Sequence, residues 1–337
     1  MNIRELSEKL EKKTFSRYAT LSNKTKGREI KEELCDVCTV FQIDKDRIIR
    51  SKAFRRLKHK TQVFISPVGD HFTTRLIHSL EVSQIARTIA RALKINEDLV
   101  EAISLGHDLG HSPFGHVGED VLNKICAGGF DHAKQSVRIV KKLENNGLGL
   151  NLTLETIDGI LNHSKKNIPN TCEGILVKIC DKIAYINHDI DDIIRANKLK
   201  IEDIPKKFRD LAGICATKRI NFFIRSIINS SKNGVIKMDN ETQEAFDEVL
   251  NFMYTNVYFS DIIKTEETKV PYLIEALFKY FVENIQKLPK EFQKNIETEG
   301  KDRIICDYIS GMTDEFAINI FKDIFIPKSF GIKILAN

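Results

Sequence analysis

Apolar residues recur at steps of three and four along most of the chain, and glycine and proline are sparse. This spacing is typical of helices that bury one side, because an α-helix completes a turn in about 3.6 residues. Over residues 76–93, Leu80, Ile85, Ile89 and Leu93 mark the apolar side, and arginines interrupt the other. The same pattern predicts further helices over residues 97–105, 135–143, 174–196, 210–230, 241–255, 272–288 and 314–325.

Strand signals are few and short. The candidates are TQVFIS (residues 61–66) and GVIKM (residues 234–238), the second of which follows an Asn-Gly turn signal. The chain has no internal repeat, no low-complexity segment and no linker rich in Pro, Gly or Ser. Charge rises near residues 198–205, where a proline interrupts the pattern, but the helices beyond continue the same bundle. We therefore predict one compact all-α domain over residues 1–337, with at most a few short strands.

The bulk composition is that of an ordinary globular protein: 337 residues, 42% hydrophobic and 29% charged, with a formal net charge of +5. Such a small charge supports at most a local preference for anions and does not by itself indicate nucleic acid. The N-terminus is charged and has no apolar segment, and no window approaches the roughly 18 apolar residues of a membrane span. We expect a cytoplasmic protein that does not enter a membrane.

The seven cysteines are odd in number. Five of them lie in apolar helical pattern, which favours buried, reduced thiols over a disulfide framework: Cys126, Cys172, Cys180, Cys215 and Cys306. The other two, Cys35 and Cys38, form a lone CxxC pair. Without a second pair this is weak evidence for zinc or redox chemistry, and incidental thiols are the preferred interpretation.

The candidate functional residues are mainly histidines, which are concentrated in one part of the chain. Six of the nine lie between residues 71 and 132: His71, His78, His107, His111, His116 and His132. The stretch LGHDLGHSPFGH (residues 105–116) alone holds three, together with an aspartate. His78 shares a helix face with apolar residues four, seven and eleven positions later, so it is expected on the buried side, with Arg75 one turn earlier.

A buried group of this kind favours a metal site. One histidine on an apolar face is more often a hydrogen-bonded core residue, but several buried polar groups without partners each cost kcal/mol, and a divalent cation satisfies them together. His107 and Asp108 end an apolar run and can present an imidazole and a carboxylate to one ion. The helix over residues 174–196 adds Asp181, Tyr185 and Asp189 at steps of four, beside its apolar stripe.

The same predicted helix carries further charged residues. Lys182, next to Asp181, is placed to meet an anion near the metal. Asp191 and Asp192 are expected to form a solvated acidic face.

These residues resemble a known family. The pattern H…HD…D is that of HD-domain metal-dependent phosphohydrolases, and the blocks RSKAFRRLKHKTQVF, RLIHSLEVSQIARTIA, LGHDLGHSPFGHVGED, FDHAKQSVR and DYISGMTDEFA resemble the bacterial dGTP triphosphohydrolases and related dNTPases. The blocks span about residues 47–325. The resemblance implies an HD core at about residues 47–200 with a C-terminal helical part at about 201–337. It also implies hydrolysis of a deoxynucleoside triphosphate at the α-phosphorus, giving a deoxynucleoside and tripolyphosphate.

The resemblance also implies roles for single residues. The metal ligands are His78, His107, Asp108 and Asp181. A catalytic pair is His116 with Glu119, in which the carboxylate orients the imidazole that protonates the leaving group, and His132 assists. The residues that contact the phosphates are Arg75, His111 and Lys182, those that hold the deoxyribose are Tyr185 and Asp189, and the one on the base or sugar side is Gln62. Tyr185 further resembles a steric gate against a 2′-hydroxyl.

The sequence leaves several properties open. His and carboxylate ligands suit Mg, Mn, Fe, Co, Ni or Zn. Ala133 replaces an asparagine common in bacterial relatives, and the chain lacks the insertions of the best known dGTP-specific enzymes, so the resemblance does not decide between dGTP alone and several dNTPs as substrate. The basic run over residues 47–60 fits a solvated helix face, a site for a regulatory dNTP at a subunit interface, or a contact for single-stranded DNA. Family members form oligomers, so we expect a homo-oligomer.

Two alternative functions remain. One is an HD phosphohydrolase that acts on nucleoside monophosphates or on an alarmone nucleotide; it explains the metal ligands but not the His116/Glu119 pair. The other is a regulator that binds nucleotides or single-stranded nucleic acid and carries a vestigial HD site. The intact ligand set speaks against it, and only the basic run supports it.

Overall fold

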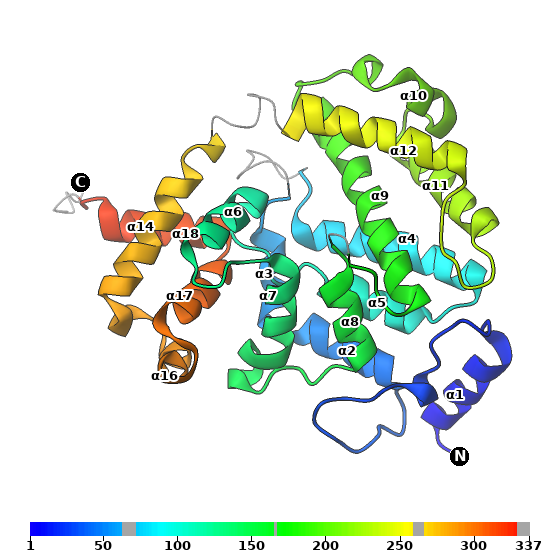
Figure 1. The fold of residues 1–337 in the computed structure, drawn as a ribbon, viewed down its shortest axis with the longest axis horizontal. Helices are drawn as coiled ribbons and strands as arrows, with labels where there is room; N and C mark the ends of the chain where they lie inside the picture. Colours follow the sequence, from blue (N-terminus) through cyan, green and yellow to red (C-terminus); the bar gives the residue numbers. More distant parts are fainter. Residues whose placement is uncertain (63–71, 165–166, 259–265, 329–337) are drawn as a thin grey trace, which may run out of the picture.

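The computed structural model describes residues 1–62, 72–164, 167–258 and 266–328, and these residues form helices joined by loops, of which the one over residues 25–39 is long (Figure 1). Extended pairing among them is limited to three isolated bridges: Arg28 with Thr153, Thr61 with Thr74, and Lys232 with Val235. The predicted all-α class is therefore confirmed. The strand prediction for residues 234–238 is wrong, since Val235 only closes a tight turn. Most of the other strand candidate, residues 63–66, lies outside the described residues.

The first half of the chain carries the helices α1 (Ile3–Thr14), α2 (Val40–Arg50), α3 (Lys52–Arg56), α4 (Arg75–Leu93), α5 (Glu97–Gly106), α6 (Gly115–Ile125), α7 (His132–Arg138), α8 (Leu154–Asn162) and α9 (Cys172–Arg195). The second half carries α10 (Lys206–Ala212), α11 (Ala216–Ser230), α12 (Asn240–Met253), α14 (Val270–Glu283), α15 (Lys290–Gln293), α16 (Ile296–Glu299), α17 (Lys301–Ser310) and α18 (Asp314–Phe325). Short 3-10 turns are η1 (Ser22–Lys24), η2 (Leu57–His59), η4 (Asn145–Gly147), η5 (Ile201–Asp203) and η7 (Ile285–Lys287), and π-helical turns are η3 (Ile139–Leu143) and η6 (Tyr254–Tyr258).

Helix ends follow local chemistry. The Thr74 side chain accepts a hydrogen bond from the Ile77 backbone N–H at the start of α4, and Lys94 ends the helix in the left-handed conformation, with φ 55°. The single helix predicted over residues 210–230 is in fact two, because the chain turns at Gly213, where φ is +84°. Leu80 is 47% exposed, so the buried side of α4 lies along His78, Val82, Ile85 and Ile89 instead.

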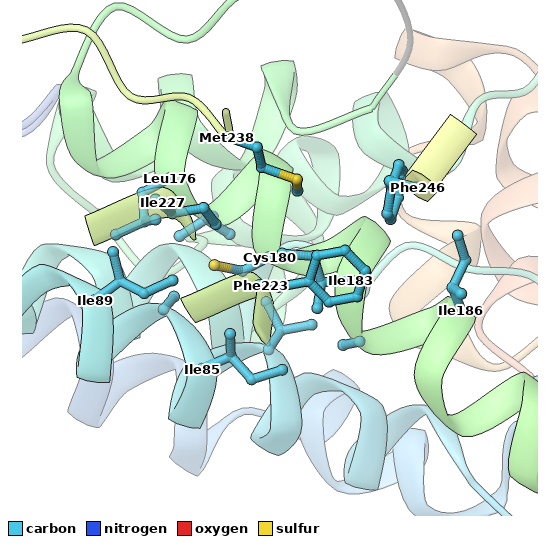
Figure 2. Packing of buried hydrophobic residues seen from close by; sticks show 14 of the residues in the cluster. Ile85, Ile89, Leu176, Cys180, Ile183, Ile186, Phe223, Ile227, Met238 and Phe246 are labelled. Carbon is cyan, nitrogen blue, oxygen red and sulfur yellow. The ribbon is translucent and has the colours of Figure 1, made fainter. Parts of the chain in front are cut away.

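Three hydrophobic clusters hold the helices together. The largest joins α4, α5, α9, α11 and α12, and Figure 2 shows side chains of α4, α9, α11 and α12 meeting in it. A second joins α6, α14, α17 and α18 on the other side of the molecule, and a third joins α2, α3, α5, α8 and η3 (Figure 1). Each fully buried Leu or Ile contributes about 1.5–3 kcal/mol, so these clusters fix the helices that carry the histidines.

The cysteine prediction is partly wrong. Cys126, directly after α6, and Cys306 in α17 form a disulfide, and Cys215 is exposed; Cys172 is half-buried, and Cys180 is a buried free thiol as expected. Both cysteines of the CxxC pair are free as well. The disulfide links the helix that carries His116 to the C-terminal helices.

None of the helices in the described ranges combines the length and the apolar character needed to cross a membrane.

Candidate functional site

The candidate metal ligands converge at the centre of the fold. His78 lies in the first turn of α4, His107 is the residue at the C-terminal end of α5, Asp108 follows it, and Asp181 lies in α9. Both α5 and α9 pack against α4. His78, His107 and Asp108 are each no more than 3% exposed. The four residues predicted from the sequence are therefore brought together, although they lie up to 103 positions apart.

The ligand atoms face one another. His78 Nε2 lies 3.0 Å from Asp181 Oδ1 and 4.0 Å from Asp108 Oδ2. His107 Nε2 lies 3.4 Å from Asp108 Oδ1 and 3.7 Å from Asp181 Oδ1. His78, His107 and Asp108 each offer a ligand atom within 4.8 Å of the others, the arrangement of a group that could hold a metal ion.

The protonation of these residues also suits a cation. His107 Nδ1 donates to the Ser104 carbonyl at 2.6 Å, which leaves the Nε2 lone pair facing the carboxylates, and Nε2 has no hydrogen-bond partner among the described residues. Burial lowers the pKa of His78 despite the nearby carboxylates, so its imidazole is neutral. Burial opposes ionisation of Asp108 and Asp181, but the surrounding histidines, and Arg75 at Asp108, outweigh it and lower both pKa values. Neutral imidazoles beside carboxylates fit a divalent metal.

A buried arginine and a further buried histidine lie next to this centre. Arg75 is 2% exposed and donates from Nη1 to Asp108 Oδ2 at 2.9 Å, while its Nε and Nη2 have no partner among the described residues. His111 Nε2 lies 3.1 Å from Asp108 Oδ1, and burial and the Arg75 charge lower the pKa of His111. Asp108, His111 and His132 form a second group with ligand atoms within 4.8 Å of one another. Unsatisfied guanidinium donors at such a depth fit an anionic ligand such as a phosphate.

The Glu119 carboxylate lies closer to His132 than to His116. Its carboxylate lies 2.9 and 3.0 Å from His132 Nδ1 and accepts a hydrogen bond from the His132 backbone N–H at 2.9 Å. His116 Nδ1 is 3.8 Å from Glu119 Oε2, and the His116 side chain is 79% exposed. Burial disfavours the charged form of His132, but Glu119 outweighs it and raises the pKa of the imidazole. In the same way, His116 and His132 outweigh burial and lower the pKa of Glu119. The geometry favours His132 as the partner of Glu119.

Two buried histidines were not singled out from the sequence. His163, at the C-terminal end of α8, donates from Nδ1 to the Ile160 carbonyl, and its Nε2 lies 3.3 Å from His132 Nε2. Burial lowers the pKa of His163 to about 4, so this Nε2 is a lone pair and His132 must present an N–H to it. His188 in α9 lies with Nε2 3.0 Å from His78 Nδ1. His188 follows Asp181 by seven residues, two helical turns, so the spacing could have found it.

The residues predicted for the sugar and base lie along the same helix and next to it. Tyr185 is half-buried in α9, and Asp189 is 3% exposed and accepts a hydrogen bond from the Tyr258 hydroxyl of η6. Gln62 is half-buried, with an Oε1 that has no partner in the described part of the chain. Lys182 is exposed and lines a cavity of about 300 Å³ together with Lys178. The sugar, base and phosphate roles of these residues stay predictions.

Other sequence expectations meet mixed outcomes. Asp192 is buried, not solvated: it accepts the Thr73 backbone N–H at 3.1 Å and pairs with Arg195. His71 lies outside the described residues. In the basic run over residues 47–60, four cations line a cavity of about 690 Å³ away from the histidines: Arg50, Lys52, Arg55 and Arg56. The regulatory dNTP and single-stranded DNA interpretations of this run stay predictions.

Comparison with known proteins adds independent findings. Residues 75–186 match the HD domain family, and residues 236–323 match the phosphohydrolase-associated domain family. The chain is 55% identical over 328 residues to a deoxyguanosinetriphosphate triphosphohydrolase-like protein of Caldanaerobacter subterraneus subsp. tengcongensis, covering 97% of both chains. It is 46% identical to a protein of the same name from Clostridium perfringens, covering 97% of this chain and 99% of the relative. A hypothetical protein of known structure from Aquifex aeolicus is 23% identical, with a TM-score of 0.49 and coverage of 85% of this chain and 69% of the other.

Proposed function

Since the chain belongs to the family of deoxyguanosinetriphosphate triphosphohydrolase-like proteins with an HD domain and an HD-associated domain, we propose that it hydrolyses deoxynucleoside triphosphates at the α-phosphorus. The products are a deoxynucleoside and tripolyphosphate. The observation that carries the proposal is the buried group of His78, His107 and Asp108, with Asp181 beside it and the unsatisfied guanidinium donors of Arg75 next to it.

The metal site is assigned to His78, His107, Asp108 and Asp181. A divalent ion held by these residues would supply Lewis-acid chemistry, activating water for attack and offsetting the charge of the α-phosphate. Arg75 contributes donors that can bind phosphate oxygens without first breaking bonds to the protein, because its Nε and Nη2 lack partners in the described ranges.

Proton delivery is assigned to His132. Its Nδ1 donates to the ionised Glu119, and its Nε2 faces a lone pair on His163, so both ring nitrogens carry protons. An imidazolium of raised pKa is the form required of a general acid that protonates the 5′-oxygen leaving group. His116 lies on the exposed side of Glu119 and is assigned to substrate contact.

The substrate is assigned to the deoxy series. Tyr185 lies one helical turn after Asp181 on α9, where its ring can pack against the sugar and leave no room for a 2′-hydroxyl. Nothing in the donor set selects a base, so the proposal covers dGTP and the other dNTPs alike.

One experiment tests the proposal. Each dNTP is incubated alone and in pairs with the protein in the presence of Mg²⁺ or Mn²⁺, and the products are resolved by ion-exchange chromatography. Tripolyphosphate and deoxynucleoside in equal amounts are expected. Orthophosphate or pyrophosphate as product would refute the reaction and favour a phosphohydrolase of monophosphates or alarmones.

Two controls accompany this experiment. The variant His107→Ala/Asp108→Ala should lose both turnover and bound metal; activity in that variant would show that the site is elsewhere. Acceleration of one dNTP by another would identify a regulatory dNTP, and size-exclusion chromatography of the same samples tests the expected homo-oligomer.

A further inference from the structure

His188 occupies a position beside the candidate metal centre that no ligand assignment explains. It is 4% exposed and lies in α9, seven residues after Asp181. Its Nε2 is 3.0 Å from His78 Nδ1, and the two rings meet edge to face, with centroids 5.1 Å apart. Its Nδ1 is 2.7 Å from Asp189 Oδ1, and the other oxygen of that carboxylate accepts the Tyr258 hydroxyl. A continuous row of polar atoms therefore runs from η6 to His78.

A cation bound to His78 Nε2 sets the direction of this row. The one proton of the neutral His78 ring then lies on Nδ1 and faces His188 Nε2, 3.0 Å away, which accepts it. His188 in that state carries its own proton on Nδ1, 2.7 Å from the Asp189 carboxylate. His188 is therefore placed to keep the His78 Nε2 lone pair turned toward Asp108 and Asp181.

The other candidate histidine ligand is oriented in a different way. His107 Nδ1 donates to the Ser104 carbonyl of its own helix, an acceptor that a substitution of Ser104 would not remove. For His78, the acceptor is a side chain on another helix, and it can be replaced. The two ligands therefore differ in how much they depend on a single residue.

We propose that His188 is a positioning residue for the metal ligand His78: held by Asp189, it accepts the His78 Nδ1–H and so fixes the ring and the tautomer that bind the metal. This inference rests on the metal site of the proposed function. The contacts continue from His188 through Asp189 to the Tyr258 hydroxyl. Tyr258 belongs to the segment that matches the HD-associated domain, so this segment is connected to the candidate metal centre through side chains.

The test compares two substitutions of His188 by side chains of similar length, which differ in whether they can accept a hydrogen bond. In His188→Gln, the side-chain oxygen can still accept the His78 Nδ1–H while the NH₂ faces Asp189; in His188→Met, no comparable acceptor remains. Protein stripped with chelator is titrated with Mn²⁺ by calorimetry, and the unfolding midpoint of each metal-free variant is measured as the control for folding. We expect Mn²⁺ affinity to fall about 10–100-fold in His188→Met and to stay within about threefold of the parent in His188→Gln.

The outcomes separate this inference from the proposed function. Unchanged Mn²⁺ affinity in His188→Met, or an equal loss in both variants, overturns the positioning role. If His188→Met does not fold, Asp189→Asn replaces it, with an expected loss of several-fold in Mn²⁺ affinity, and wild-type affinity there overturns the role as well. A parent chain that binds Mn²⁺ but does not produce tripolyphosphate contradicts the proposed function and leaves the role of His188 standing.

Discussion

The choice between His132 and His116 as proton donor can be decided by substituting each with Gln. His132 is held by three contacts to Glu119 within 3.0 Å, whereas His116 is 3.8 Å away and largely exposed. A general acid contributes about 10²–10⁴-fold to a rate, which is about 3–5.5 kcal/mol of barrier. We expect His132→Gln to lower kcat by about that factor and His116→Gln to lower it by less than about tenfold.

Glu119→Gln is the companion variant. A hydrogen bond to a charged group contributes about 1.5–3 kcal/mol, so removing the carboxylate charge is expected to lower kcat about 10–100-fold at slightly alkaline pH, where the imidazolium depends on it most. The amide still fills the space and can still accept, which limits the effect on folding.

The pH dependence has a defined sign. The pKa of His132 is raised from its ordinary 6.5, so the proton donor is present below the raised value and is lost as the pH rises through it. The parent kcat should therefore fall on the alkaline side, and in Glu119→Gln this fall should move to lower pH. The same pair stabilises the fold: the His132 contribution is lost as the pH rises through its raised pKa, and the Glu119 contribution is lost as the pH falls through its lowered pKa.

The assay is the full pH profile of kcat under saturating substrate for the parent and the three variants, with folding checked by circular dichroism. If kcat of His116→Gln no longer fell at alkaline pH while the pH profile of His132→Gln matched the parent, the assignment of His132 as proton donor would be refuted. An unshifted profile in Glu119→Gln would show that the carboxylate does not control the donor.

Three further predictions concern selectivity and stability. Tyr185→Ala should narrow the preference for dGTP over GTP, measured as the ratio of their kcat/KM values, and an unchanged ratio would exclude a steric gate. Gly110→Ala should destabilise the fold by about 1–3 kcal/mol or more in denaturant unfolding, because the added Cβ would lie 2.2 Å from the Ser136 backbone nitrogen; a neutral effect would contradict that packing. The double variant Cys126→Ser/Cys306→Ser should have a free energy of unfolding about 2–4 kcal/mol below that of the oxidised parent. Reductant should lower the free energy of unfolding of the parent and leave that of the variant unchanged.

Helical periodicity predicted most of the fold, because apolar stripes on helices 10 to 24 residues long are strong signals. It failed where one residue changed the backbone, as at Gly213, and where partners are distant, as in the disulfide between Cys126 and Cys306, which are 180 positions apart. The convergence of the four candidate ligands could be predicted from residue type and family resemblance, and their role as metal ligands stays a prediction. His163 could not, since its contact with His132 exists only because α8 packs against α7.

Asp192 shows how a helix face can be misjudged when charge is given more weight than spacing. It follows Asp181 by eleven residues, about three turns, so it lies on the face that carries the candidate ligand and not on the solvated one. Asp181, Asp189 and Asp192 are therefore parts of one stripe of α9, and each has a polar neighbour: Asp181 faces His78, Asp189 faces His188, and Asp192 accepts the Thr73 N–H.

The C-terminal helices act on the site through buried polar contacts. Asp314, in the first turn of α18, accepts the Phe114 backbone N–H at 2.9 Å and both the backbone N–H and the hydroxyl of Thr61. Phe114 adopts a left-handed conformation, with φ 62°, directly before α6, so this carboxylate holds the turn that delivers His116 and Glu119. Lys60 donates to the carbonyls of residues 111 and 310, which joins the same turn to α17. Because these partners are buried and come from both halves of the chain, the positions of His116 and Glu119 depend on contacts from the second half as well as from the first.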